Sequence, residues 1–260
     1  MSTASARDRL VRLVERTNVA VSVAGLLLVW LALDRSDLVG SLPGPVVVAG
    51  TMGSLLMSPA IRTPVETSLF HVFSSFLVAT AIGVPLGLAI GWSTPVRDLV
   101  FPSLEVLRPV PPISWIPLTV LVLPTVQTSI VFITFLGAFF PILLNTIRGV
   151  RDVEYDYVRA VRSLGGSKAD VFRNVVYPGA LPSIRTGLVT GMGLAWVNLV
   201  AAEMIGNNGL GRFVWVSYAS GSYPDIVAGV AIIGALGYAS SQVVRWISGT
   251  QLRWNRQTDV

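Results

Sequence analysis

The chain has 260 residues, of which 52% are hydrophobic and only 13% are charged, and its mean hydropathy is +0.68. This composition excludes an ordinary soluble domain, in which roughly a quarter of the residues are charged, and it indicates that lipid is the solvent. The absence of cysteine excludes disulfides and thiolate metal sites, and the net charge of +5 comes from basic residues that flank apolar segments, as expected at anionic lipid and not for nucleic-acid binding.

The N-terminal segment, residues 1–17, carries four arginines. It is expected to be cytoplasmic, either as a short helix on the membrane surface or as a solvated tail. The apolar run Asn18–Leu33 that follows has the length of a signal-peptide core, but Ala32-Leu33-Asp34 lacks the small-x-small pattern of a cleavage site. The run therefore predicts an uncleaved first span. Residues 34–66 predict an external loop with one short helix.

Five further apolar segments are candidate spans, and the last two have close to the roughly 20 residues that cross a hydrocarbon core of about 30 Å. They are Thr67–Trp92, Ile113–Thr125, Thr128–Ile147, Ile184–Ile205 and Ile226–Ile247. Prolines interrupt the second and third of these, which a bilayer tolerates only where neighbouring helices or a water-filled cavity satisfy the freed backbone groups. The pattern predicts an all-α, polytopic membrane protein with about six transmembrane helices and a transmembrane domain at residues 18–247.

The distribution of basic residues predicts the orientation of these spans. With six spans, 16 lysines and arginines fall on one side, and only Arg35, Arg62 and Arg212 fall on the other. Basic residues are enriched in cytoplasmic loops, so both termini, including a C-terminal tail at residues 248–260, are expected in the cytoplasm. The protein is expected to be a multi-pass protein of a prokaryotic inner (plasma) membrane.

A cytoplasmic loop at residues 148–182 separates the fourth and fifth spans, and it is long, charged and patterned as helix. A helix, a break at Gly165 and a second helix ending at a proline are expected to form a compact knob below the membrane. A knob of this kind on a membrane protein is suited to docking a partner.

The knob carries a motif that resembles the EAA loop of permease subunits of ATP-binding-cassette (ABC) importers, which reads E-A-A-x3-G-x9-I-x-L-P. The corresponding residues here are Arg159, Ala160, Val161, Gly165, Val175, Tyr177 and Pro178. Arg159 stands where the family has glutamate. The resemblance implies that these residues, with Ser167, couple the chain to an ATPase.

Other segments resemble the permeases for nitrate, bicarbonate, sulfonates and taurine. They are Leu107–Pro112, Phe140–Thr146 and Val200–Gly211. The resemblance covers most of the chain beyond the first span. One departure is Leu123–Val126, where many relatives have a Trp-Phe-Gly stretch.

This resemblance implies the type I (MetI-like) permease fold, with five core helices and an added first helix, working as a homodimer. It also implies two ATPase subunits and a periplasmic or lipid-anchored substrate-binding protein as partners. This chain has no phosphate-binding G-x4-G-K-[ST] loop, because Gly165-Gly166-Ser167-Lys168 lacks both the spacing and the Gly-Lys order. ATP and Mg²⁺ are therefore expected on the partner ATPase, with no cofactor, metal or catalytic residue on this chain.

Polar residues within the spans are candidates for the translocation path or a gate. Glu203 is the only acidic residue in a span and is expected to act as a gate or loop anchor, with a snorkelling structural carboxylate as the alternative. Asn198 is a candidate pore-lining donor or a helix-packing amide. The remaining candidates are His71, for which an interhelical hydrogen bond is the alternative, Ser74 and Asn145.

Two rival functions remain at this stage. One is an ion channel or secondary transporter of a small anion, and the other is an intramembrane enzyme. Paired carboxylates and lysines, which proton-coupled carriers and most membrane enzymes use, are absent from the predicted spans. A channel has no use for a docking knob. The sequence leaves open which small anion the importer carries.

Overall fold

The computed structural model describes residues 21–22, 24–36 and 42–249, and every regular element in these residues is a helix. Residues 24–35 are helical, and they include most of the described residues of the first predicted span, Asn18–Leu33. The start of that span, the predicted N-terminal segment 1–17 and almost all of the predicted tail 248–260 lie outside the described residues.

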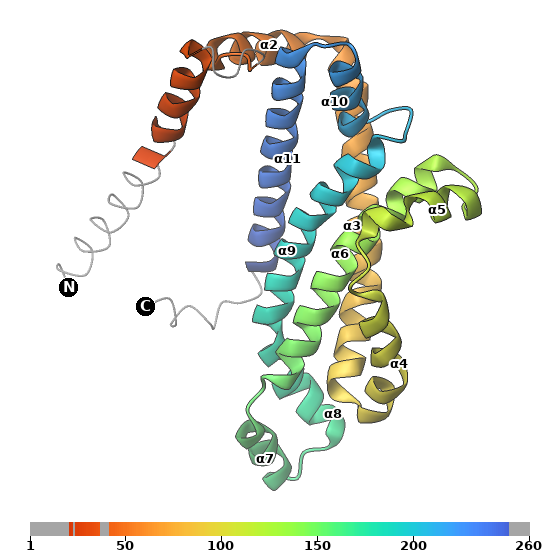
Figure 1. Cartoon of the computed structure of the whole chain (residues 1–260). Coiled ribbons are helices and arrows are strands. Elements are labelled where there is room, and N and C mark those ends of the chain that lie inside the picture. Colours follow the sequence, from red (N-terminus) through yellow and green to blue (C-terminus); the bar gives the residue numbers. More distant parts are fainter. Residues whose placement is uncertain (1–20, 23, 37–41, 250–260) are drawn as a thin grey trace, which may run out of the picture.

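Three long helices form the centre of the molecule: α3 (Pro59–Trp92), α6 (Val126–Arg151) and α9 (Tyr177–Glu203). The most extensive contacts between helices are those of α6 with α9 and of α6 with α3. Helices α3 and α6 run in the same direction and α9 runs in the opposite one (Figure 1). Their shared core is apolar and fully buried, with Val72, Ile133, Leu143, Met192 and Leu199 inside it.

Glycines allow α6 and α9 to approach closely. A side chain at Gly191 would lie 3.0 Å from the Ala138 carbonyl oxygen, and one at Gly187 would lie 3.2 Å from the Pro141 carbonyl oxygen. Small residues at such positions let helix backbones pack directly in a bilayer, where van der Waals contact supplies much of the attraction between helices. Gly187 and Gly191 therefore mark the contact of α9 with α6.

Four helical stretches in the described residues are long and apolar enough to cross a membrane. They are Pro59–Trp92, Val126–Arg151, Lys168–Glu203 and Tyr223–Gly249, the last of which is α11. They contain the second, fourth and sixth predicted spans and all but the last two residues of the fifth. Each is longer than predicted because its amphipathic ends continue beyond the apolar run.

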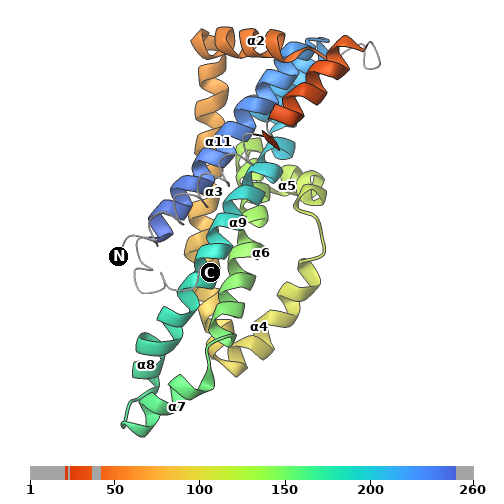
Figure 2. The same ribbon diagram turned by 90° about the vertical axis from the view of Figure 1, so that its left-hand side faces the viewer.

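The prediction of a third span at Ile113–Thr125 is wrong as a single helix. The chain forms α4 (Thr94–Leu107), a 3₁₀ turn η1 (Pro112–Trp115) and the seven-residue α5 (Ile116–Val122). Seven residues of helix extend only about 10 Å, against a hydrocarbon core of about 30 Å. Pro112 is the first residue of η1 and Pro117 the second residue of α5, where a missing N–H costs no helical hydrogen bond, and Pro124 follows the residue that caps the end of α5. Together α4 and α5 still lead the chain back from the end of α3 to the start of α6 (Figures 1 and 2).

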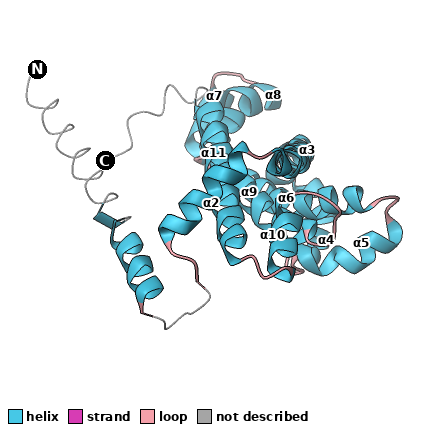
Figure 3. Ribbon diagram, turned by 90° about the horizontal axis from the view of Figure 1, so that it is seen from above, coloured by secondary structure: helices cyan, strands magenta, loops and turns pink. Residues whose placement is uncertain are grey.

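Shorter elements cover the central helices. Helix α2 (Pro45–Met57), the short helix predicted for the loop after the first span, lies across the end at which α3 begins, and α10 (Leu210–Ala219) follows α9 at that end (Figure 1). Viewed from above, α2 and α11 lie on one side of α6 and α9, and α5 lies on the other (Figure 3). The two sides of the central helices therefore have different neighbours.

The predicted knob is present at the opposite end. It consists of α7 (Tyr155–Ser163) and α8 (Lys168–Val171), which project beyond α6 and α9 (Figures 1 and 2). The expectation that its second helix ends at Pro178 is wrong. The π-helical turn η2 (Phe172–Val176) joins α8 to α9, so the helix continues past the proline. A widened π turn accommodates the missing Pro178 N–H and its ring.

Candidate functional site

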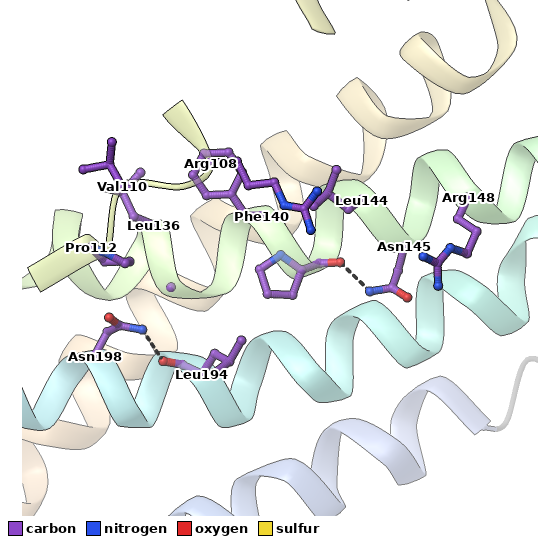
Figure 4. Close-up of a pocket in the computed structure, with 12 residues that line it drawn as sticks. Arg108, Val110, Pro112, Leu136, Phe140, Leu144, Asn145, Arg148, Leu194 and Asn198 are labelled. Atoms are coloured by element: carbon purple, nitrogen blue, oxygen red, sulfur yellow. Dashed lines mark hydrogen bonds between the residues drawn. The ribbon is translucent and has the colours of Figure 1, made fainter. Parts of the chain in front are cut away.

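A groove of about 440 Å³ lies along α6 and α9, beside the segment that links α4 to α5 (Figure 4). It contains two of the residues predicted for the translocation path, Asn145 and Asn198. The complete lining is Arg108, Val110, Pro112, Leu136, Gly137, Phe140, Pro141, Leu144, Asn145, Arg148, Leu194 and Asn198. The groove therefore combines apolar walls with four polar side chains.

The two asparagines are held in the same way. Asn145 Nδ2 donates to the Pro141 carbonyl oxygen at 2.8 Å, and Asn198 Nδ2 donates to the Leu194 carbonyl oxygen at 2.8 Å (Figure 4). Each bond uses one of the two amide hydrogens, so each side chain keeps a second N–H and an acceptor oxygen. The bonds fix the amides to their own helices and leave them able to contact a solute.

Arg108 and Arg148 give the groove its charge. No aspartate or glutamate lines it, and neither arginine forms an ion pair with any residue in the described part of the chain. Both arginines are among the 16 basic residues assigned to the cytoplasmic side, and Arg108 also lies in the segment Leu107–Pro112 that resembles the anion permeases, but neither was predicted to line the path. Arg148 follows Asn145 by three residues on α6, so the two lie on the same face of the helix. Because Asn145 was a predicted path residue, this spacing could have predicted that Arg148 lines the same groove. The groove is cationic, which favours an anion as its occupant.

A second polar cluster lies at the outer end of α9, the end opposite the knob, and is centred on Glu203. The Glu203 side chain is fully buried. Ser68 Oγ lies 2.8 Å from each carboxylate oxygen, and the Gly211 backbone N–H donates to Oε2 at 2.9 Å. His71 Nδ1 lies 3.0 Å from Oε1 and donates in the tautomer that carries its hydrogen there. The carboxylate thus joins α3, α9 and α10.

The loop after Glu203 is shaped around the carboxylate. Gly209 has φ +115°, a conformation that L side chains rarely adopt, and a side chain there would also overlap the Glu203 carboxyl group. Asn208 Nδ2 donates to Thr67 Oγ1 at 3.1 Å, and the Leu210 N–H donates to Ser68 Oγ at 2.8 Å. Because the carboxylate is enclosed by these groups, it does not snorkel to the surface.

The structure separates the remaining predicted path residues. His71 belongs to the Glu203 cluster and does not line the groove. Ser74 donates to the His71 carbonyl oxygen at 3.1 Å and lies at a different, apolar surface hollow with Phe70 and Phe132. Of the five predicted path or gate residues, two therefore share the groove, two share the buried cluster, and Ser74 belongs to neither.

The first helix of the knob ends in a Schellman motif. Gly165 has φ +83°, and the Gly165 and Gly166 N–H groups donate to the carbonyl oxygens of Arg162 and Val161, both at 3.0 Å. Ser167 then caps α8 through a reciprocal capping box with Asp170. The glycine and serine of the motif are therefore the residues that set the turn between the two helices.

A small apolar cluster fastens the knob to the ends of α6 and α9. It consists of Val150, Val171, Val176, Ala180 and Ile184, with Val158 and Val161 packed against it. The other motif residues lie further out, because Arg159 and Ala160 are exposed and Val175 and Pro178 are half-buried.

Exposed apolar residues that the sequence did not predict also lie on the knob surface. Leu164 is 89% exposed, Tyr155 is 66% exposed and Tyr157 is 61% exposed. These side chains are accessible to a partner protein.

Comparison with known proteins identifies the family. Residues 83–252 match the family described as the binding-protein-dependent transport system inner membrane component. The chain is 35% identical over 239 residues to the nitrate import permease protein NrtB of Synechocystis, covering 88% of this chain and 86% of the relative. It is 32% identical over 244 residues to the taurine transport system permease protein TauC of Escherichia coli, covering 90% and 88%.

A solved structure supports the fold independently. The inward-facing methionine ABC transporter MetNI aligns with a TM-score of 0.62 at 19% sequence identity, covering 78% of this chain and 99% of that chain. These findings confirm the predicted type I permease fold. They also confirm the resemblance to ABC importer permeases, from which that fold was predicted. The chain belongs to the family of inner membrane components of binding-protein-dependent transport systems, and it is a multi-pass permease of the ABC importer type.

Proposed function

We propose that this permease carries a small anion, of the nitrate, bicarbonate, sulfonate or taurine type, along the groove between α6 and α9. The observation that carries the proposal is the pair of arginines, Arg108 and Arg148, in a groove without acidic residues. The relatives named for nitrate and taurine transport point to the same class of substrate. The two asparagine amides add neutral hydrogen bonds, which suit a solute that must also be released.

The knob suits coupling to a separate ATPase. An importer permease works with an ATPase and a substrate-binding protein, and ATP and Mg²⁺ belong on the ATPase subunit. A rigid knob fixed to α6 and α9 by an apolar cluster can transmit a push from the ATPase to both helices, which line the groove. The functional unit is a homodimer of this chain with two ATPases below it and a binding protein above.

The knob and both termini lie on the cytoplasmic side in this proposal, because 16 of the 19 basic residues fall on that side in the six-span arrangement. A Ser167→Cys variant tests the orientation cleanly in a chain that has no cysteine. Ser167 is exposed, so a membrane-impermeant maleimide is expected to label it in inside-out vesicles and not in intact cells. Labelling from outside intact cells would contradict the orientation.

The groove proposal predicts how its arginines act on transport. In Arg148→Gln and Arg108→Gln variants the uptake rate is expected to fall roughly tenfold or more, because a hydrogen bond to a charged group contributes about 1.5–3 kcal/mol. The substrate concentration at half-maximal uptake is expected to stay unchanged, because the binding protein captures the substrate. Uptake of labelled nitrate, bicarbonate and taurine measures both quantities and identifies the anion.

A matched control is Arg245→Gln, which removes the same charge near the end of α11, outside the groove. This variant is expected to keep the uptake rate of the wild type. Equal losses in all three variants would show that the arginines act only through general charge, and would contradict an anion path in the groove.

A further inference from the structure

A second cleft, of about 480 Å³, lies between the end of α3 nearest the knob and the segment formed by α8 and the start of η2. Its α3 side is formed by Pro85, Leu88, Ala89 and Trp92, and its knob side by Lys168, Ala169 and Phe172. The Trp92 and Phe172 rings meet edge to face with centroids 5.6 Å apart. The cleft therefore lies at the joint between a membrane-crossing helix and the knob.

The depth of this cleft corresponds to the edge of the bilayer. Trp92 is the last residue of one candidate membrane span and Lys168 is the first residue of another. Tryptophan and lysine are the residues that bilayers hold at the headgroup level, where the ring and the long side chain each have one apolar and one polar end. The apolar wall at 85–89 extends from this level towards the hydrocarbon core.

The lining of the cleft favours an occupant that is apolar along most of its length and negatively charged at one end. Six of its seven lining residues are apolar, and the seventh is Lys168. Lys168 forms no ion pair with any described residue. The nearby Asp170 carboxylate instead binds the Ser167 N–H and hydroxyl through Oδ2, at 2.9 Å and 2.6 Å. The ammonium is free to bind a phosphate above an apolar slot.

We propose that this cleft binds an anionic phospholipid of the cytoplasmic leaflet. The phosphate pairs with Lys168, and an acyl chain lies along Pro85, Leu88 and Ala89, against Trp92. A water-soluble anion would leave the apolar wall uncovered, and a zwitterionic lipid such as phosphatidylcholine would bring its own cation beside the lysine and weaken the attraction. The bound lipid packs between α3 and the knob, beside the contact of Trp92 with Phe172. It therefore stabilises the position of the knob relative to α3.

Quenching of Trp92 fluorescence tests the site directly. The permease is placed in bilayers that contain phosphatidylglycerol or phosphatidylcholine brominated near the headgroup, and the signal of a Trp92→Phe variant is subtracted to isolate Trp92. Brominated phosphatidylglycerol is expected to occupy the cleft about fivefold more strongly than brominated phosphatidylcholine, which is the attraction of one lysine for an anionic headgroup. Lys168→Gln is expected to abolish this preference.

Arg245→Gln is the control, because it removes one positive charge near the end of α11 and leaves the cleft intact. It is expected to keep the preference for phosphatidylglycerol. Equal quenching by both lipids in the wild type, or a preference that survives Lys168→Gln, would overturn the site. Loss of the quenching when the ATPase subunit is added would also overturn it, since the cleft would then belong to the ATPase contact.

Discussion

A Glu203→Gln variant is expected to unfold at lower temperature and to transport more slowly than the wild type. The buried carboxylate lies within hydrogen-bonding distance of Ser68, His71 and the Gly211 N–H, and all three belong to this chain. An amide offers one acceptor oxygen in place of two, so at least one buried donor loses its partner. Each such loss costs about 1–3 kcal/mol. Because α10 is fastened through this carboxylate, the outer end of α9 is expected to loosen as well.

Thermal unfolding in detergent and uptake in cells measure the two effects. Glu105→Gln is the matched control, because Glu105 is exposed on α4 and has no hydrogen-bonded partner among the described residues. Ser68→Ala is expected to reproduce part of the loss of stability, since Ser68 Oγ contacts both carboxylate oxygens. A Glu203→Gln variant with wild-type stability and abolished uptake would show that the charge acts on the substrate and not on the fold.

The sequence predicted the features that depend on local pattern. The hydropathy of the long spans and the spacing of Gly165 and Pro178 are properties of short stretches, and the structure contains the corresponding helices and the knob turn. The third span failed because hydropathy alone does not reveal how Pro112 and Pro117 divide an apolar run into a 3₁₀ turn and a seven-residue helix.

Contacts between residues far apart in the sequence could not be predicted from the sequence alone. Glu203 and His71 lie 132 residues apart, and the tertiary packing of α3 against α9 brings them together. Arg108 was predicted as a cytoplasmic charge within the resembling segment Leu107–Pro112 and not as a path residue, because its place in the groove depends on how the segment after α4 folds back beside α6. Helical phase could indicate Arg148, but it could not indicate Arg108.

A Gly165→Asp variant is expected to abolish coupled transport while the permease still inserts into the membrane. Gly165 has φ +83° at the end of α7, and a Cβ there would have no atom of the described residues within 4 Å apart from its two chain neighbours. The new carboxylate would therefore point outward from the knob, into the surface proposed to dock the ATPase, and would have to lose water at that contact. Insertion depends on the spans, so the amount of permease in the membrane is expected to be unchanged.

Gly165→Asn is the matched control for this variant. Asparagine has nearly the same size as aspartate and tolerates the left-handed backbone conformation, but it adds no charge. It is expected to keep much more of the uptake than Gly165→Asp. Equal losses in the two variants would assign the effect to the backbone of the turn and not to a charge in the docking contact.

The most direct test of the account compares these two variants in the complete transporter, reconstituted in lipid with its ATPase and binding protein. ATP hydrolysis with and without the loaded binding protein is measured together with uptake of the anion. The account predicts that the wild type links hydrolysis to uptake, and that Gly165→Asp loses both uptake and the stimulation of hydrolysis or no longer retains the ATPase. Wild-type uptake and wild-type stimulation in Gly165→Asp would contradict it, because the knob would then not transmit the action of the ATPase to the groove.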